Sequence, residues 1–372
     1  SRRFIMANLK VNTVSGIGTE GTVFDGGLHF RSENYLTLPK GTTTERIATS
    51  SGISTEIGAI RYNTDSNKME CYVNDKWMIV SVSTPNLDGG ARGLFGGGGY
   101  PNNQNIIDFV TISSVGNATD FGDLNNTAIL TGSCSSRTRG LFAGDYPSAS
   151  NVIEFVTISS TGNATDFGDR TTTGFNLGGH SNETRGLFFG GHAPADRDVI
   201  DFVTIASTGN AIDFGNLLSV THGIIGCASP TRGVMGGNST PNNVIQFVTI
   251  ASTGNAQDFG DLIRSTHNMG SASNATRGLF GGGSQGPMNE IQFITIATLG
   301  NAIDFGDLSV ARQCSDGAPS PTRCLFGGGY QPGNSNVIDY VEFPTEGNAV
   351  DFGDLTSARH APSGVSNAHG GL

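Results

Sequence analysis

The segments TRGLFFGG (184–191), VIDFVTI (199–205) and STGNAIDFGNL (207–217) form one copy of a unit that the chain repeats six times. The arginines that lead the six copies recur at steps of 47, 46, 47, 45 and 46 residues: Arg92, Arg139, Arg185, Arg232, Arg277 and Arg323. A fixed period of this length indicates that one supersecondary unit is stacked repeatedly. The repeat therefore predicts an architecture, although it does not by itself predict a function.

Each copy contains four candidate strands and no stretch of helical periodicity. In the third copy, an apolar run closed by glycines (186–191) is followed by a run rich in β-branched and aromatic residues (199–205). A tight Gly-Asn hairpin leads into 211–217, and a weaker segment, 219–227, leads into the next copy. Four short antiparallel strands in about 46 residues are typical of a propeller blade, so we expect an all-β fold.

The repeat resembles kelch-type blades over residues 88–372. The resemblance is carried by the glycine pair after an apolar strand, by the aromatic residue in the next strand and by a second aromatic residue about a dozen residues later. Phe202 and Phe214 occupy the places where kelch repeats usually have Tyr and Trp, which is a departure from the family pattern.

The array begins at Arg92 with the second strand of a blade and ends, within 357–367, with a first strand that has no partner of its own. If the ring closes, this last segment supplies the missing first strand of the first blade. An open array would leave an exposed sheet edge, which favours aggregation. We therefore expect a six-bladed kelch-like β-propeller that is closed by the C-terminal strand.

Residues 1–85 lack the repeat and are expected to form a small β-rich module, followed by a connector at 84–91. Short strands are predicted at 60–62, 69–73 and 77–82, with turns at 64–67 and 74–75. The sequences LTLPKGTT (36–43) and GAIRYNTDSNKMECYVNDKW (58–77) resemble a module of tail-fibre and other virion proteins of tailed bacteriophages. The resemblance implies a structural part that attaches or oligomerises the chain.

Composition argues against several classes of protein. The net charge of −11 disfavours a protein that tracks nucleic-acid phosphates. No apolar run approaches 18 residues, so no membrane insertion is expected, and SRRFIM (1–6) is too short in its apolar part for a signal peptide. The five cysteines lack the CxxC spacing of a zinc site and are expected to be buried free thiols. No cofactor is expected.

The repeated residues are expected to be scaffold. Aromatic residues of two repeated positions are predicted to pack between blades: Phe109, Phe155, Phe202, Phe247, Phe293 and Tyr340, and Phe121, Phe167, Phe214, Phe259, Phe305 and Phe352. The repeated arginines are predicted to pair with the first Asp of each Asp-Phe-Gly-Asp stretch (Asp-Phe-Gly-Asn in the third copy). Carboxylates for acid–base catalysis are the alternative, but sixfold repetition counts against one distinctive catalytic site.

One further position varies between copies, ten residues before each arginine or, at the end of the array, before Gly370. It is occupied by Ile129, Phe175, His222, His267, Gln313 and His360. Histidines that face a central channel could bind a metal. A sixfold ring would hold them apart, however, so we expect solvated or backbone-bonded histidines on the first strands and no metal site.

The loops after the glycine pairs differ most between copies, and alternation of the strands places them on one side of the ring. A constant frame with divergent loops on one side is how a binding surface is built, although unconstrained drift of loop tips gives the same pattern. The candidate ligand-binding residues are Tyr100, Asn102, Tyr146, His192 and Tyr330.

Together these features predict a virion structural protein without enzymatic activity, assembled in the host cytoplasm. We expect a tail-fibre or fibre-like adhesin whose loops bind a host-surface glycan or protein. The alternative is a capsid or tail decoration protein that only packs against other virion proteins. A polysaccharide-degrading enzyme ranks third, because no carboxylate or metal set is evident. The expected partners are other virion proteins through the first module, in a homo-oligomer, for example a trimer.

Overall fold

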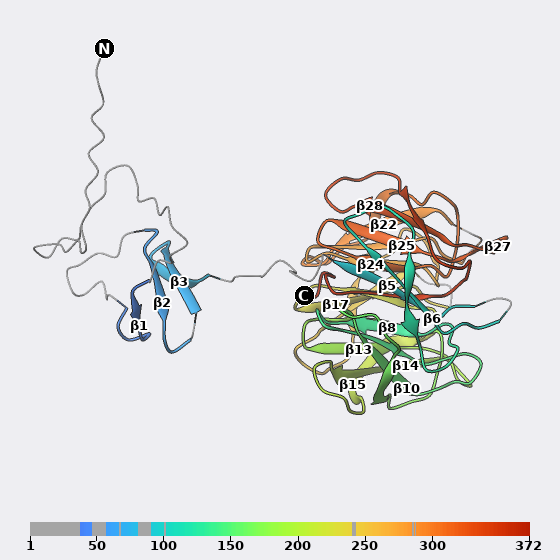
Figure 1. Cartoon of the computed structure of the whole chain (residues 1–372), viewed down its shortest axis with the longest axis horizontal. Helices are drawn as coiled ribbons and strands as arrows, with labels where there is room; N and C mark the ends of the chain where they lie inside the picture. The colour runs from blue at the N-terminus through green and yellow to red at the C-terminus, as the bar shows by residue number, and fades with distance from the viewer. Residues whose placement is uncertain are drawn as a thin grey trace, which may run out of the picture. The chain divides into compact units, whose positions relative to one another are not determined.

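The computed structural model describes residues 38–46, 57–66, 68–80, 91–99, 102–239, 243–284, 286 and 288–372. The chain divides into two compact units, Ser1–Thr84 and Pro85–Leu372. Within the described residues there are no helices, and seven four-stranded sheets account for most of the regular structure (Figure 1). The prediction of an all-β fold is therefore confirmed.

The first unit contains one sheet, in the order β1 (Lys40–Gly41), β2 (Ile60–Asn63), β3 (Lys68–Val73) and β4 (Lys76–Ile79). Strand β4 is shorter than predicted, and residues 81 and 82 lie outside the described residues.

A buried polar cluster, centred on a carboxylate, explains the Arg-Tyr-Asn sequence of this sheet. Glu70 is fully buried and accepts hydrogen bonds from Arg46 and Asn63. The Asn63 side chain in turn accepts from the backbone N–H of Asp65, which shapes the β2–β3 turn. A buried charge is stable only when it is paired and hydrogen-bonded in this way.

The second unit contains the other six four-stranded sheets, each built from three strands of one repeat and a first strand from the repeat before it or, for the first sheet, from the last repeat (Figure 1). We number the strands of a sheet from first to fourth. The first strands are β30 (Ser363–Ser366), β8 (Gly132–Ser135), β12 (Gly178–Ser181), β16 (Ile225–Ala228), β20 (Gly270–Ser273) and β24 (Asp316–Pro319). The second strands are β5 (Arg92–Gly96), β9 (Arg139–Ala143), β13 (Arg185–Phe189), β17 (Arg232–Gly236), β21 (Arg277–Gly281) and β25 (Arg323–Gly327).

The third strands carry variants of the Val-Ile-Asp-Phe-Val-Thr sequence: β6 (Ile106–Thr111), β10 (Val152–Thr157), β14 (Arg197–Thr204), β18 (Val244–Thr249), β22 (Glu290–Thr295) and β28 (Val337–Glu342). The fourth strands are β7 (Thr119–Asp123), β11 (Thr165–Asp169), β15 (Ile212–Thr221), β19 (Gln257–Asp261), β23 (Ile303–Asp307) and β29 (Val350–Asp354). A small hairpin, β26 (Tyr330–Gln331) and β27 (Gly333–Asn334), lies in the last loop.

The two ends of the repeat array are joined by the pairing of β30 with β5, in the register Ser363↔Gly96 to Ser366↔Gly93. The first strands contact one another in the order β30, β8, β12, β16, β20, β24 and back to β30. Strand β5 accordingly lies beside β24, and the two are seen together in Figure 1. The six sheets thus form a propeller-like ring without a free first-strand edge.

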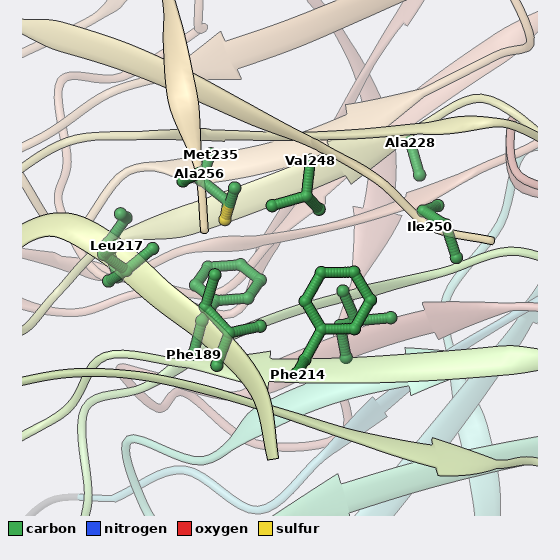
Figure 2. Close-up of a cluster of buried hydrophobic side chains, with 11 residues drawn as sticks. Phe189, Phe214, Leu217, Ala228, Met235, Val248, Ile250 and Ala256 are labelled. Atoms are coloured by element: carbon green, nitrogen blue, oxygen red, sulfur yellow. The ribbon is translucent and has the colours of Figure 1, made fainter. Parts of the chain in front are cut away.

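Six hydrophobic clusters lie between successive sheets, including one between the last sheet and the first. Figure 2 shows the cluster between the third and fourth sheets, where Phe189 and Phe214 of one sheet face Met235, Val248 and Ile250 of the next. All five side chains are at most 3 % exposed. Burial of large apolar side chains contributes about 1.5–3 kcal/mol each, so these six interfaces hold the ring together.

A β-bulge explains why each Asp-Phe-Gly stretch has its sequence. In the third sheet, Ile200 pairs with Gly215 and Asp201 pairs with Asp213, so Phe214 is the extra residue of the fourth strand. The same register shift occurs between the third and fourth strands of all six sheets. The bulge directs Phe214 into the sheet interface, where its ring meets that of Phe202 edge to face at 5.9 Å.

The first strand that we predicted within 219–227 is shorter than expected. Residues 219–221, which we predicted to belong to a first strand, extend β15, because β14 and β15 form a longer hairpin that pairs Arg197 with Thr221.

Of the five free cysteines, Cys134, Cys227 and Cys324 are buried, whereas Cys71 and Cys314 are half-buried. The prediction of buried thiols is therefore correct for three of them.

Candidate functional site

Strand alternation gives the ring two distinct sides. Because successive strands are antiparallel, the loops between second and third strands leave from the same side as the connections from each fourth strand to the next sheet. We call this side the loop face. The hairpins between third and fourth strands leave from the opposite side, which we call the hairpin face.

The hairpin face is held by contacts that are repeated in every sheet. The Gly209 N–H donates to Phe167 O of the preceding sheet at 2.7 Å, and the Asn210 side chain accepts from Asp169 N at 3.1 Å. A Cβ added at Gly168 would lie 2.5 Å from Gly209 O, so only glycine allows the hairpin to dock this closely. The constant Gly-Asn-Ala and Asp-Phe-Gly sequences are therefore structural.

The repeated arginines also join neighbouring sheets, but not as we predicted. The Arg185 guanidinium lies 4.7 Å from the centre of the Phe202 ring, and its Nη1 donates to Ile250 O of the next sheet at 2.9 Å. The other five arginines stack on the aromatic ring of their own third strand and donate to the next sheet in the same way.

The predicted pairing of these arginines with the first Asp of each Asp-Phe-Gly stretch is wrong. Those carboxylates are exposed in all six copies: Asp120, Asp166, Asp213, Asp258, Asp304 and Asp351. The guanidinium instead finds an aromatic face and a carbonyl oxygen, and both suit a planar cation with several donors. An exposed carboxylate remains solvated and contributes little to the scaffold.

Sequence reasoning does not identify a ring of buried polar residues, because the residue type varies from copy to copy. The middle residue of each third strand is buried: Asp108, Glu154, Asp201, Gln246, Gln292 and Asp339. Each accepts a hydrogen bond from the preceding sheet: five from the segment that follows its fourth strand, and Gln246 from the Leu218 N–H within β15. The signal that the six positions share is an acceptor side chain in an otherwise apolar strand. A buried acceptor needs a donor, so this pattern indicates a hydrogen bond from another segment.

Three of the six gaps between sheets also contain a buried ion pair. Arg170 pairs with Asp201 at 2.9 Å, Arg312 with Asp339 at 2.8 Å and Arg359 with Asp108 at 2.9 Å, and all six side chains are 0 % exposed. Burial is the main influence on each guanidinium, and it lowers the pKa of all three arginines. These arginines precede the first strands and had no evident repeat, so sequence reasoning did not find them.

The predicted binding residues fall in three different places. Tyr100 lies outside the described residues. Tyr146 is 45 % exposed and Tyr330 is 38 % exposed, both on the loop face, and Asn102 is also exposed there. Tyr330 packs against His360 at a ring separation of 6.0 Å. Only Tyr146 and His192 belong to one continuous group.

That group is a row of rings across the loop face, which we call the aromatic arc: Tyr146, Phe175, His192, His222 and His267. The centres of successive rings are 4.9, 5.4, 5.5 and 6.2 Å apart. Tyr146 and His192 lie in variable loops, whereas Phe175, His222 and His267 lie in the connections between sheets. The arc therefore spans the second to the fourth copy of the repeat.

The histidines at the variable position were predicted to lie on the first strands, and this placement is wrong. His222, His267 and His360 precede β16, β20 and β30, and they contact the variable loops instead. His360 pairs with Gly99, and His267 O accepts from the Ser284 N–H. These backbone contacts fix the connections against the loops, which brings the histidine rings to the loop face.

The axis of the ring is narrow and lined by small residues. Two cavities along it hold about 50 Å³ each. His369 lies against the first strands, with Nε2 2.7 Å from Ser135 O, and the Gly370 N–H donates to Ser273 O at 2.8 Å. Neither cavity has room for more than a few water molecules, so a ligand larger than that has to bind elsewhere.

A larger cavity of about 360 Å³ opens between the first and second sheets, beside the Tyr146 end of the arc. Its lining includes Asn103, Asp145, Ser148 and Glu154. Burial raises the pKa of both Asp145 and Glu154, and this gap has no arginine at the place that Arg312 and Arg359 occupy elsewhere. The cavity is therefore a polar recess next to exposed aromatic rings.

Asp196 joins two rings of the arc. Its Oδ1 lies 2.7 Å from His192 Nδ1 and 2.8 Å from His222 Nδ1, and its Oδ2 accepts from Ser239 Oγ at 2.8 Å. Partial burial opposes ionisation of this carboxyl, but the hydrogen bonds from His192, His222 and Ser239 outweigh it and lower the pKa of Asp196.

No family model matches the chain, and a search of curated proteins found no match either. Within the described residues, no helix is long and apolar enough to cross a bilayer. Function therefore has to be inferred from the arrangement of the side chains.

Proposed function

We propose that the chain is a virion structural protein of a tailed bacteriophage, and that it acts as an adhesin whose loop face binds a host-surface glycan. In this proposal the second unit is a six-bladed kelch-like β-propeller, and it binds rather than catalyses. The single observation that carries the binding role is the aromatic arc, because five neighbouring rings on one face exceed what a scaffold requires.

Three features support the six-bladed propeller. Each of the six sheets of the second unit has four antiparallel strands, one hydrophobic cluster separates each sheet from the next, and β30 completes the sheet that begins with β5. The glycine pair and the two aromatic positions per repeat are those of kelch blades, with Phe in place of the usual Tyr and Trp.

The chemistry of the arc suits a glycan. Sugar rings present apolar C–H faces and polar edges, so an aromatic ring with a nearby polar group recognises both parts. Tyr146 offers an exposed ring, and the polar cavity with Asn103, Asp145 and Ser148 lies beside it. Rigid aromatic side chains supply contact area at low conformational-entropy cost. A protein receptor on the host is the other ligand class compatible with such a face.

The virion assignment rests on the first unit. Its LTLPKGTT and Arg-Tyr-Asn-Thr-Asp sequences resemble the tail-fibre module. The hydrogen bonds of Asn63 with Glu70 and Asp65 explain why this sheet has an asparagine at that position. We propose that this unit attaches the chain to other virion proteins, within a homo-oligomer.

A glycan array probed with the full chain tests the binding role. We expect retention of particular surface polysaccharides by the wild-type chain and weak retention by Tyr146→Ala. Thr208→Ala serves as a matched control, because Thr208 is exposed on the hairpin face. Equal retention by all three proteins, or by none, would contradict the proposal.

Cryo-electron microscopy of the phage particle separates an adhesin from a decoration protein. The adhesin proposal expects the loop face to point away from the particle. If other virion proteins cover the loop face, the decoration role is correct and the adhesin role is wrong.

A further inference from the structure

The His192–Asp196–His222 cluster lies in the middle of the aromatic arc and has more structure than a binding ring requires. His192 and Asp196 form an isolated bridge across the variable loop of the third copy, and His222 comes from the connection to the fourth sheet. Two imidazole nitrogens thus converge on a single carboxylate oxygen. The three side chains are 36 %, 21 % and 31 % exposed, so solvent reaches them.

The converging atoms are those that divalent transition metals prefer. All three potential ligand atoms, one from each residue, lie within 4.8 Å of one another. Zinc bound to nitrogen and oxygen at 2.0–2.2 Å in a tetrahedron separates its ligand atoms by roughly 3.4 Å. The two nitrogen–oxygen distances of 2.7 and 2.8 Å therefore need to widen by about 0.6 Å, which small rotations of exposed side chains provide.

The positions of the imidazole protons allow a metal ion to replace the two hydrogen bonds to Asp196. A carboxylate only accepts hydrogen bonds, so each imidazole that contacts Asp196 presents a proton on Nδ1. In a metal complex the Nδ1 lone pair of His192 and of His222 binds the ion, and the proton of each neutral ring resides on Nε2. Two neutral imidazoles and one carboxylate reduce the charge of a divalent cation to +1, which leaves further coordination positions open to solvent.

We propose that His192, Asp196 and His222 form a three-ligand site for Zn²⁺ or a similar transition-metal cation. We expected no metal at the variable position that His222 occupies, since a sixfold ring would hold its histidines apart. His222 instead shares Asp196 with His192, a histidine that a variable loop supplies. The bound ion would tie the loop at 192–196 to the connection at 222–224. This site does not depend on the proposed adhesin function.

Calorimetric titration of the full chain, stripped of metal with EDTA, tests the site with ZnCl₂. We expect saturable binding of one ion per chain, a thermal midpoint that rises with zinc concentration, and no such binding of Mg²⁺, because nitrogen ligands disfavour it. CoCl₂ provides a second measurement, since a site with two imidazoles gives visible absorption bands that differ from those of hydrated Co²⁺.

Variants locate the ion. Asp196→Asn and His222→Ala should each weaken zinc binding at least tenfold, whereas His360→Ala, which replaces a histidine outside the cluster, should leave it unchanged. Far-UV circular dichroism confirms that the variants fold. The proposal is overturned by the absence of saturable zinc binding to the wild-type chain, or by equal binding to the wild-type chain and both cluster variants.

Discussion

The buried ion pair between the fifth and sixth sheets gives a sharp test of how the ring is held together. Arg312 and Asp339 are 0 % exposed and 2.8 Å apart. The equivalent residues in the gap between the fourth and fifth sheets are Thr266 and Gln292, which carry no charge. The chain therefore supplies its own matched design: Arg312→Thr, Asp339→Gln and the double variant that reproduces the neighbouring gap.

The expected magnitudes follow from the contacts. Arg312→Thr leaves the Asp339 carboxylate buried without its cation, and such a loss lowers the free energy of unfolding by about 3–5 kcal/mol. In a domain of this size the thermal midpoint falls on the order of 10 °C. The double variant should lose less than either single variant, because Gln292 accepts from Ile263 N at 2.8 Å without any cation. Because the double variant loses less than either single variant, the coupling energy between the two sites should be at least about 3 kcal/mol.

Equilibrium urea unfolding, followed by far-UV circular dichroism, measures these differences. Tryptophan fluorescence is unsuitable, since Trp77 is the only tryptophan and belongs to the first unit. Two results would refute the reasoning: a loss below about 1 kcal/mol for Arg312→Thr, or a double variant whose loss equals the sum of the two single losses.

Three further predictions concern the scaffold. Gly215→Ala should melt several degrees below Gly209→Ala, because the new Cβ at Gly215 meets a backbone oxygen at 2.5 Å whereas Gly209 has open space; equal melting temperatures would contradict the hairpin docking. Arg185→Lys keeps the charge but loses the planar contact with Phe202, so urea unfolding should show a loss of about 1 kcal/mol, and no loss would remove the stacking argument. Burial lowers the pKa of His180 to about 3, so the folded state resists protonation. The stability that a neutral His180 contributes is fully present above pH 6.5 and is lost by about 1.4 kcal/mol per pH unit as the pH drops from 6.5 towards 3. In pH-dependent urea titrations the free energy of unfolding of the wild-type chain should therefore fall more steeply than that of His180→Cys by this amount, and parallel pH dependences would contradict the assignment.

The fold follows from the sequence wherever the same constraint recurs in every copy. The Gly-Asn hairpin, the β-branched third strand and the phenylalanine of each Asp-Phe-Gly stretch all predicted their places in the sheets correctly. The incomplete first copy also pointed to the C-terminal strand, and β30 pairs with β5. Local turn chemistry and burial set these features, and both can be read from a short window of sequence.

The contacts between sheets were harder to predict, because they depend on which side chains meet in three dimensions. The repeated arginines were assigned to exposed carboxylates, since sequence gives no measure of the competing aromatic face and carbonyl oxygen. Arg170 enters its gap from a different position than Arg312 and Arg359 do, so no repeat marks it. When arginines at different sequence positions fill equivalent gaps between sheets, the sequence shows no repeat of that contact.

The candidate site was recovered in part. Variation of their loops predicts Tyr146 and His192 as binding residues, but the repeat places Phe175, His222 and His267 on the first strands rather than in the connections on the loop face. Their position depends on a connection that pairs with the variable loop of the sheet into which it leads, as Phe175 does with His192. A pairing between two irregular segments leaves no periodic signal.

The most direct test of the proposed adhesin is the affinity of the full chain for purified surface polysaccharide of the host, measured for three proteins. The account predicts that the Tyr146→Ala/Phe175→Ala variant binds at least tenfold more weakly than the wild-type chain, a difference of about 1.4 kcal/mol, while Thr208→Ala binds like the wild-type chain. Equal affinities of the arc variant and the wild-type chain, with both proteins folded, would contradict the claim that the aromatic arc binds the ligand.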